Sequence, residues 1–204
     1  MPDILPPLQP SLLDLLEPDS PQPADVVYFD LETQRSFDEV GGRHRIEELG
    51  LSVGVTYSST ASRFIAYSEG EVQALLAQLR QARLVVGFNV RAFDYRVLQP
   101  YASFQLSQVR TLDIMDHVVR QLGFRLSLDA LASGTLGERK AGDGLQAIRW
   151  FREGNLDQLV AYCQKDVEIV RKLFEHGTNE GCLYYFDRSG RKQRLPVDWA
   201  EKPT

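Results

Sequence analysis

The stretch VVYFDLET at residues 26–33 decides the fold. It is an apolar run of strand length, rich in β-favouring residues, and it predicts a buried strand. Two carboxylates, Asp30 and Glu32, stand two positions apart within this run. Because side chains along a strand alternate between its faces, both carboxylates must leave from the same face. An acidic pair inside an otherwise buried strand favours a functional site over a solvent-facing strand end.

The residues that follow predict a mixed sheet. Residues 51–57 and 63–67 read as two strands joined by a short polar turn. Apolar runs at 84–89 and 109–113 predict a fourth and a fifth strand, each followed by a helical pattern. Three successive strands, and then strands alternating with helices, are typical of an α/β domain. We therefore expect a mixed five-stranded sheet flanked by helices.

Helix signals accompany these strands. Ser68 and Glu71 have capping-box spacing and predict a helix that ends near residue 81. The clearest helix is 156–176, with Asn155 expected at its N-cap, because apolar residues recur there at steps of three and four. Further helices are expected from about residue 93 and at 114–122, 127–132 and 144–152.

The chain is expected to divide into three parts. Residues 1–23 hold seven of the ten prolines and predict an extended arm, whose protein partner the sequence does not identify. Residues 24–176 form the main domain. Residues 177–204 are expected to form a C-terminal β-hairpin extension, packed on the same domain and turning at 187–191. Our expectation is thus one globular domain with an arm and a hairpin.

Composition excludes several classes of protein. With 43% hydrophobic and 25% charged residues in 204, the chain is neither disordered nor fibrous. Its apolar runs fall far short of the roughly 20 residues needed to cross a bilayer, and no secretory signal opens it. Cys163 and Cys182 are expected to be reduced. These features predict a cytoplasmic protein that does not associate with membranes.

The net charge of −5 is unevenly distributed. Residues 1–34 contain seven acidic residues and neither Lys nor Arg, whereas the remainder carries 23 basic and 21 acidic residues. The acidic balance therefore reflects the first segment, and it does not exclude nucleic-acid binding by the main domain.

Two more elements place acidic residues beside core-forming segments. Tyr162 and Asp166 stand four apart on the last helix and share one of its faces. Asp94 follows the strand at 84–89, where a helix begins. On these residues alone, an exposed helix face and a helix-capping acid remain open alternatives. Asp113, at another helix start, is expected to be a cap.

Three segments carry a resemblance to a known family. VVYFDLET, GFNVRAFD (87–94) and YCQKD (162–166) stand in the order of the three exonuclease motifs of the DEDD superfamily. Over residues 26–174 the chain resembles a 3′–5′ exonuclease domain of the ribonuclease H-like fold. It is similar to the proofreading domain of family B DNA polymerases and to related bacterial predicted exonucleases. The motifs are D-x-E, N-x-x-x-F-D and Y-x-x-x-D, here Asp30 and Glu32; Asn89, Phe93 and Asp94; and Tyr162 and Asp166.

The last motif points to one branch of that superfamily. The other main branch places a histidine five residues before the final aspartate, a position that Ala161 fills here. Tyr162 fills the tyrosine position, so the chain resembles the tyrosine branch. Residues 33–48 depart from the tight first hairpin of that family, which leaves the substrate contacts there open.

The resemblance implies a metal-dependent 3′–5′ exonuclease. Such an enzyme hydrolyses phosphodiester bonds at nucleic-acid 3′ ends by a two-metal-ion mechanism and releases nucleoside 5′-monophosphates. It implies that Asp30 bridges both ions and that Glu32 and Asp166 complete the nucleophile-side ion. Asp94 would hold the second ion through water. Hard oxygen ligands favour two Mg²⁺ or Mn²⁺ ions.

The remaining roles also follow from the resemblance. The Tyr162 hydroxyl would orient the attacking water, and Thr33, Asn89 and Phe93 would bind the 3′-terminal nucleotide. The partner would be a single-stranded or frayed 3′ end of DNA or RNA, between which the sequence does not choose. The alternative is a non-catalytic nucleic-acid-binding or adaptor module on the same fold. Retention of all five catalytic motif side chains argues against it, because binding alone requires no metal ligands.

Overall fold

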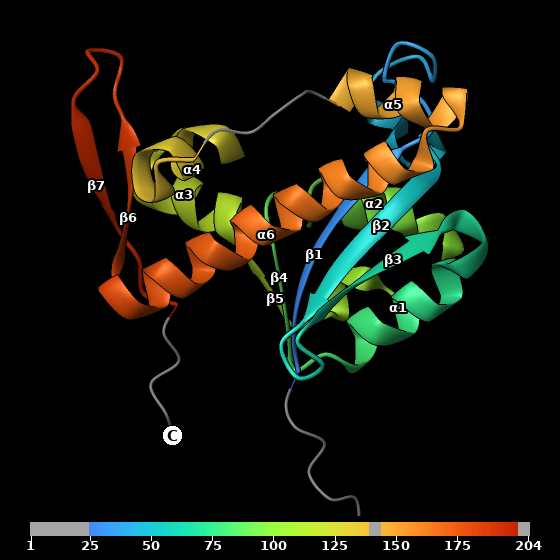
Figure 1. The fold of residues 1–204 in the computed structure, drawn as a ribbon, viewed down its shortest axis with the longest axis horizontal. Coiled ribbons are helices and arrows are strands. Elements are labelled where there is room, and N and C mark those ends of the chain that lie inside the picture. The colour runs from blue at the N-terminus through green and yellow to red at the C-terminus, as the bar shows by residue number, and fades with distance from the viewer. Residues whose placement is uncertain (1–24, 139–143, 200–204) are drawn as a thin grey trace, which may run out of the picture.

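The computed structural model describes residues 25–138 and 144–199, so the expected Pro-rich arm lies outside the described residues. Its centre is a five-stranded mixed sheet with the strand order β3-β2-β1-β4-β5 (Figure 1). Antiparallel pairing joins β1 to β2 and β2 to β3, whereas β1, β4 and β5 run parallel. The strands are β1 Val26–Thr33, β2 Leu51–Ser58, β3 Arg63–Ser68, β4 Leu84–Gly87 and β5 Thr111–Asp113. The predicted fold class is therefore confirmed.

The central strand β1 is buried on both faces. Val27, Phe29 and Leu31 pack into one hydrophobic cluster, and Tyr28 packs into a second cluster together with residues of the last helix. This alternation is what period-2 side-chain geometry requires of a strand covered on both sides. It sends the even-numbered positions of β1, including Asp30, toward that helix.

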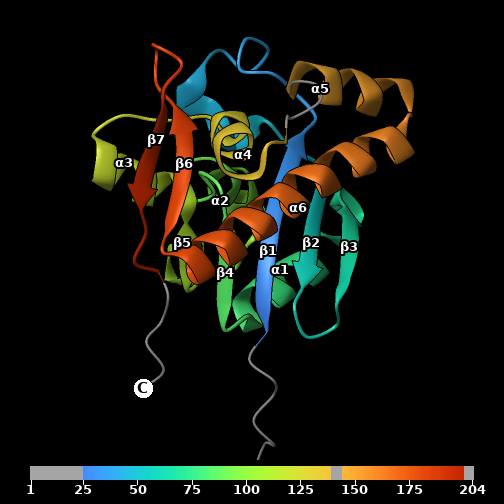
Figure 2. The ribbon, with the colours of Figure 1, turned by 60° about the vertical axis from the view of Figure 1, so that its left-hand side comes forward.

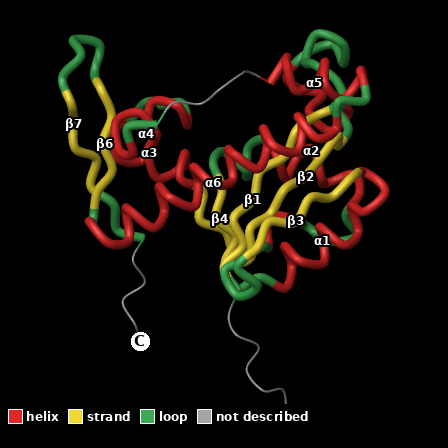
Figure 3. Tube along the Cα trace, in the orientation of Figure 1, coloured by secondary structure: helices red, strands yellow, loops and turns green. Residues whose placement is uncertain are grey.

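Helices cover the two faces of the sheet. The long helix α6 crosses one face in front of β1, and α1 lies against the opposite face (Figures 2 and 3). The expected capping box is present at Ser68 and Glu71, and it opens a 3₁₀ turn that leads into α1. The helices are α1 Val72–Gln81, α2 Asp94–Leu98, α3 Ile114–Leu122, α4 Leu128–Leu136, α5 Gly144–Glu153 and α6 Leu156–Glu180.

One expectation for α6 is corrected. The helix continues past residue 176 to Glu180, where the left-handed Gly181 ends it, and Gly177 lies within it against the ring of Trp199. A Cβ at that glycine would lie 2.4 Å from the indole, so a side chain there would prevent the contact. Asn155 stands at the N-cap of the helix, as expected, but its side chain makes no capping hydrogen bond. Its side-chain amide donates to the carboxylate of Glu153 at 2.9 Å.

The predicted C-terminal hairpin consists of β6 Cys182–Phe186 and β7 Lys192–Pro196, with its turn at the expected residues. It packs against α4 through a close approach at Gly134, where a Cβ would lie 2.4 Å from the carbonyl oxygen of Tyr184. The Thr135 hydroxyl also donates to that oxygen at 3.0 Å and accepts from the Tyr184 N–H at 2.9 Å. Helix α4 therefore covers the outer edge of β6.

Both cysteines are buried free thiols, as expected. Among the described helices, none combines the length and the apolar character that crossing a bilayer requires.

Candidate active site

A cavity of about 830 Å³ opens beside the C-terminal half of β1. Its walls come from β1, residues 35–43, the turn after β4, and helices α5 and α6. Both acidic residues of β1 line it, and so do one acidic residue at the start of α2 and one in the middle of α6. These four carboxylates are Asp30, Glu32, Asp94 and Asp166.

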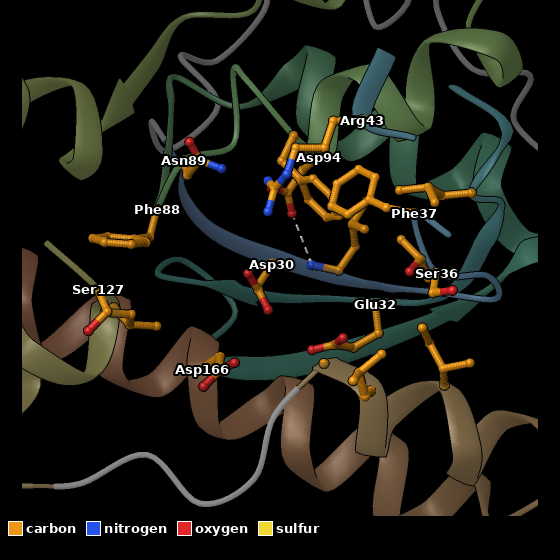
Figure 4. Close-up of a pocket in the computed structure, with 18 of the residues that line it drawn as sticks. Asp30, Glu32, Ser36, Phe37, Arg43, Phe88, Asn89, Asp94, Ser127 and Asp166 are labelled. Carbon is orange, nitrogen blue, oxygen red and sulfur yellow. Dashed lines mark hydrogen bonds between the residues drawn. The ribbon is translucent and has the colours of Figure 1, made fainter. Parts of the chain in front are cut away.

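Three of these carboxylates form a tight cluster. Asp30 and Glu32 leave β1 on the side that faces α6, and Asp166 comes from α6 to meet them (Figure 4). One carboxylate oxygen from each lies within 4.8 Å of the other two, and Asp166 is only 2% exposed. Like charges at this separation destabilise one another unless a cation or a proton intervenes. The donor set, made only of hard oxygens, fits a divalent ion of the Mg²⁺ type.

Asp94 also lines the cavity and lies outside the tight cluster. It begins α2, is 2% exposed, and accepts a hydrogen bond from the Leu31 N–H at 3.2 Å (Figure 4). Burial, followed by the charge of Asp30, raises the pKa of the Asp94 carboxyl well above its usual range. The site therefore holds a carboxylate whose ionised form requires added positive charge.

Tyr162 lies one helical turn before Asp166 on α6 and also lines the cavity. Its ring packs edge-on against Trp150 of α5, with ring centroids 5.7 Å apart. The residue after Tyr162, Cys163, is fully buried, and its thiol donates to the Asp30 carbonyl oxygen at 3.5 Å. Burial and the nearby carboxylates raise the pKa of this thiol. Cys163 is a small buried side chain on the apolar face of α6, as the spacing of apolar residues in the sequence predicted.

Asn89 lines the cavity from the turn after β4, in a left-handed backbone conformation with φ of +66°. Its N–H donates to Asp113 Oδ1 at 2.7 Å. Its side-chain oxygen accepts from the Arg125 guanidinium at 2.6 Å. The same Asp113 caps α3 by accepting from the Met115 N–H, as expected for a capping acid. Asp113 and Arg125 therefore fix the backbone and the side chain of Asn89.

Thr33 and Phe93 also line the cavity. Thr33 lies where the β1–β2 register shifts, and its hydroxyl donates to the Arg35 carbonyl at 3.0 Å. The ring of Phe93 meets Phe37 edge-on, with centroids 6.0 Å apart. Both residues thus reach the cavity, although Phe93 also supports its wall.

The segment after β1 supplies cavity residues that sequence reasoning missed. Arg35, Phe37 and Arg43 line the cavity, and the Arg43 guanidinium lies 4.7 Å from the Phe37 ring centroid. A contact between the Glu39 carboxylate and Arg152 of α5, at 2.5 Å, ties this segment to the opposite wall. The only signal in the sequence was a polar stretch bounded by glycines, which does not predict the path of the chain.

The fold and the site together define an α/β protein with an acidic cleft suited to divalent metal ions. The chain belongs to the RNase_H superfamily, whose family model matches residues 27–178. None of the curated proteins matches it. Nucleases predominate in this superfamily, so the family and the acidic cluster both indicate a nuclease.

Proposed function

We propose that this protein is a metal-dependent 3′–5′ exonuclease of the tyrosine branch of the DEDD superfamily, related to polymerase proofreading domains. The observation that carries the proposal is the convergence of the Asp30, Glu32 and Asp166 carboxylates within 4.8 Å. Asp94 lines the same cavity, and Tyr162 lies one turn from Asp166. These five residues are the ones that the exonuclease motifs assign to catalysis.

The four carboxylates would hold two Mg²⁺ or Mn²⁺ ions: Glu32 and Asp166 would serve the nucleophile-side ion, Asp94 the second ion, and Asp30 both. When bound, such ions activate a water molecule and stabilise the charge on the leaving oxygen. Asp94 is held for this role by the Leu31 N–H, which leaves its other carboxylate oxygen available. Burial is the main cause of the raised pKa of the Asp94 carboxyl, and a bound cation would lower that pKa again.

The side chains of the protein would position the reactants. The Tyr162 hydroxyl can donate and accept a hydrogen bond, and it would orient the attacking water. Arg35, Arg43 and Arg125 would offer positive charge to substrate phosphates. Thr33, Asn89 and the aromatic wall of Phe37 and Phe93 would bind the terminal nucleotide. The water oxygen would bond to the phosphorus as the bond from phosphorus to the 3′ oxygen of the preceding nucleotide breaks. The shortened strand would keep a 3′-hydroxyl, and the terminal residue would leave as a nucleoside 5′-monophosphate.

Single-stranded or frayed 3′ ends of DNA or RNA are the proposed substrates. The test is incubation of 5′-labelled DNA and RNA strands with Mg²⁺ or Mn²⁺. We expect progressive shortening from the 3′ end, which Asp30→Ala abolishes and Asp157→Ala, at an exposed acid on the same α6, does not. Persistent full-length strands, or activity that survives Asp30→Ala, would contradict the proposal. Salt-sensitive binding without turnover would indicate the non-catalytic module instead.

A further inference from the structure

The C-terminal hairpin presents two chemically different faces. In its register, Tyr184 stands opposite Arg194 and Phe186 stands opposite Lys192. Residues directly opposed in an antiparallel pair project to the same side, so these four share one face. The other face carries Leu183 and Leu195, which are fully buried against the main core. The first face is therefore turned away from the core.

The hairpin is also strongly basic. Residues 182–196 contain four cations and a single acid, Asp187. The Asp187 carboxylate is used within the turn, where it accepts from the Ser189 hydroxyl at 2.6 Å and contacts Arg191 at 3.2 Å. Within residues 25–138 and 144–199, no carboxylate pairs with Arg188, Lys192 or Arg194. Three exposed cations therefore lie on the same hairpin as Phe186, which is 48% exposed and stands opposite Lys192.

The hairpin turn reaches toward the same side of the molecule as α5 and the segment after β1, which wall the cavity, but it stands at the opposite end of the long axis (Figure 1). The loop between α3 and α4 connects the two regions. Its Phe124 meets Tyr185 of the hairpin edge-on, with centroids 6.2 Å apart, and is 49% exposed. The next residue, Arg125, lines the cavity and binds Asn89. Exposed aromatic and cationic side chains thus link the hairpin to the candidate active site.

We propose that Phe186, Arg188, Lys192 and Arg194, the hairpin surface, bind the part of the nucleic-acid strand that lies upstream of the 3′ end in the cavity. This inference rests on the proposed function. Cations would contact phosphates, and Phe186 would stack on a base, the combination by which proteins bind single strands without reading their sequence. An acidic protein or an anionic membrane could also attract these cations and this ring, but the link through Phe124 and Arg125 to the cavity favours a nucleic-acid strand.

The test measures binding of 5′-labelled strands by fluorescence anisotropy in chelator, which prevents hydrolysis. The variant is Lys192→Gln with Arg194→Gln, and the control is Arg63→Gln with Arg80→Gln, two exposed cations on β3 and α1 at the opposite side of the sheet. A strand of about 20 nucleotides exceeds the usual single-strand site and would reach the hairpin. A trinucleotide would occupy the cavity alone.

We expect the hairpin variant to bind the long strand roughly tenfold more weakly. The dependence of log K on log salt should become shallower by about 1.4, since each lost single-strand phosphate contact removes about 0.7. Binding of the trinucleotide, and of either strand by the control variant, should match that of the unmodified protein. Phe186→Ala should weaken the long complex without changing the salt slope, and Phe186→Tyr should restore it, because stacking releases no counterions.

Equal losses in the hairpin and control variants, or unchanged affinity in the hairpin variant, would overturn the inference. So would a hairpin variant that loses binding to anionic vesicles or acidic peptides while keeping its affinity for strands. Hydrolysis by the unmodified protein in Mg²⁺ or Mn²⁺ tests the proposed function separately. Length-dependent binding that the hairpin variant weakens, found without hydrolysis, would reject the exonuclease and retain the hairpin surface.

Discussion

The backbone N–H of Leu31 donates to Oδ1 of Asp94 at 3.2 Å, joining the strand that carries two site carboxylates to the helix that carries another. On its β4 side, β1 is paired only over Val26 to Tyr28. Beyond Tyr28 the edge of β1 would have an unsatisfied buried N–H, and the Asp94 carboxylate takes the place of a strand partner. The early end of β4 thus fixes the position of Asp94 beside Asp30.

Asp94→Asn should stabilise the metal-free protein while abolishing hydrolysis. Asparagine keeps an oxygen for the Leu31 N–H and removes a charge that burial and Asp30 disfavour. An acid with a raised folded-state pKa contributes most stability below 3.8, its ordinary value, and loses it as pH rises through the raised pKa. The gain in Tm should therefore grow from pH 4 to pH 7. Thermal melts in chelator test this, and about 1 kcal/mol corresponds to about 2–4 °C. A lower Tm for the variant at pH 7 would contradict it.

Mn²⁺ should raise the Tm of the unmodified protein, because a ligand that binds only the folded state stabilises it. A concentration one hundred times the dissociation constant adds about 2.7 kcal/mol. Asp30→Asn, within the carboxylate cluster, should remove most of this shift, and Asp157→Asn on the exposed start of α6 should retain it. Melting curves across a Mn²⁺ series measure the effect. An equal shift in both variants would place the bound ion elsewhere.

Tyr162→Phe should lower kcat about 10- to 100-fold with little change in KM, as expected when a group positions water in the transition state without binding the ground state. The ring keeps its edge-on packing on Trp150, so the variant should retain its Tm. Steady-state digestion of a 5′-labelled strand separates the two constants. A raised KM with unchanged kcat would instead assign Tyr162 to substrate binding.

Asn89→Gly and Asn89→Ala form a matched pair. Both remove the side chain that Arg125 orients, so both should raise KM. Only alanine should also lower stability, by about 1–2 kcal/mol, because asparagine tolerates the left-handed backbone at φ of +66° and glycine adopts it freely, whereas alanine does neither. Urea unfolding of the two variants measures the difference. Equal stabilities would show that the turn rearranges.

The Glu39–Arg152 contact should make the cavity wall sensitive to acid. Hydrogen bonds from Ser36, followed by Arg152, lower the pKa of the Glu39 carboxyl to about 2. A lowered pKa means that the stabilisation is present above the unfolded value of 4.5 and is lost as pH falls through about 2. The protection factors against hydrogen exchange in residues 144–153, which are corrected for the intrinsic pH dependence of exchange, should therefore fall over this range. Glu39→Gln should show the faster exchange already at neutral pH, and identical profiles would disprove the link.

The sequence predicted what depends on local periodicity. The alternation along β1 placed Asp30 and Glu32 on one side, and helical spacing placed Tyr162 and Asp166 together, because both rules concern neighbours along the chain. It did not predict Arg43 or Arg125 beside the cavity. Their positions depend on how irregular segments cross the finished sheet, which is set by packing and by individual contacts rather than by a repeat.

The boundaries that differed have equally local causes. The pairing of β4 ends at Gly87, because Asn89 adopts a left-handed backbone conformation and the Asn89 N–H donates to the Asp113 carboxylate instead of to a strand. Helix α6 continues through Gly177, which leaves room for the indole of Trp199, a partner 22 positions away in the chain, and it ends before the left-handed Gly181. Neither contact is visible in a pattern of apolar residues. Single tertiary contacts therefore shift the ends of helices and strands away from the positions that glycines and strand length suggest.

At Gly134 the hairpin backbone meets α4 so closely that even a methyl group would collide with Tyr184. This close contact fixes the position of the hairpin on α4. The orientation of the hairpin therefore does not depend on the residues near its turn. The charged and aromatic residues near the turn, and the length of the turn, can then vary without disturbing the elements that carry the acidic cluster. Gly134 thus fixes the attachment of the hairpin to α4, while the residues of its turn are free to change.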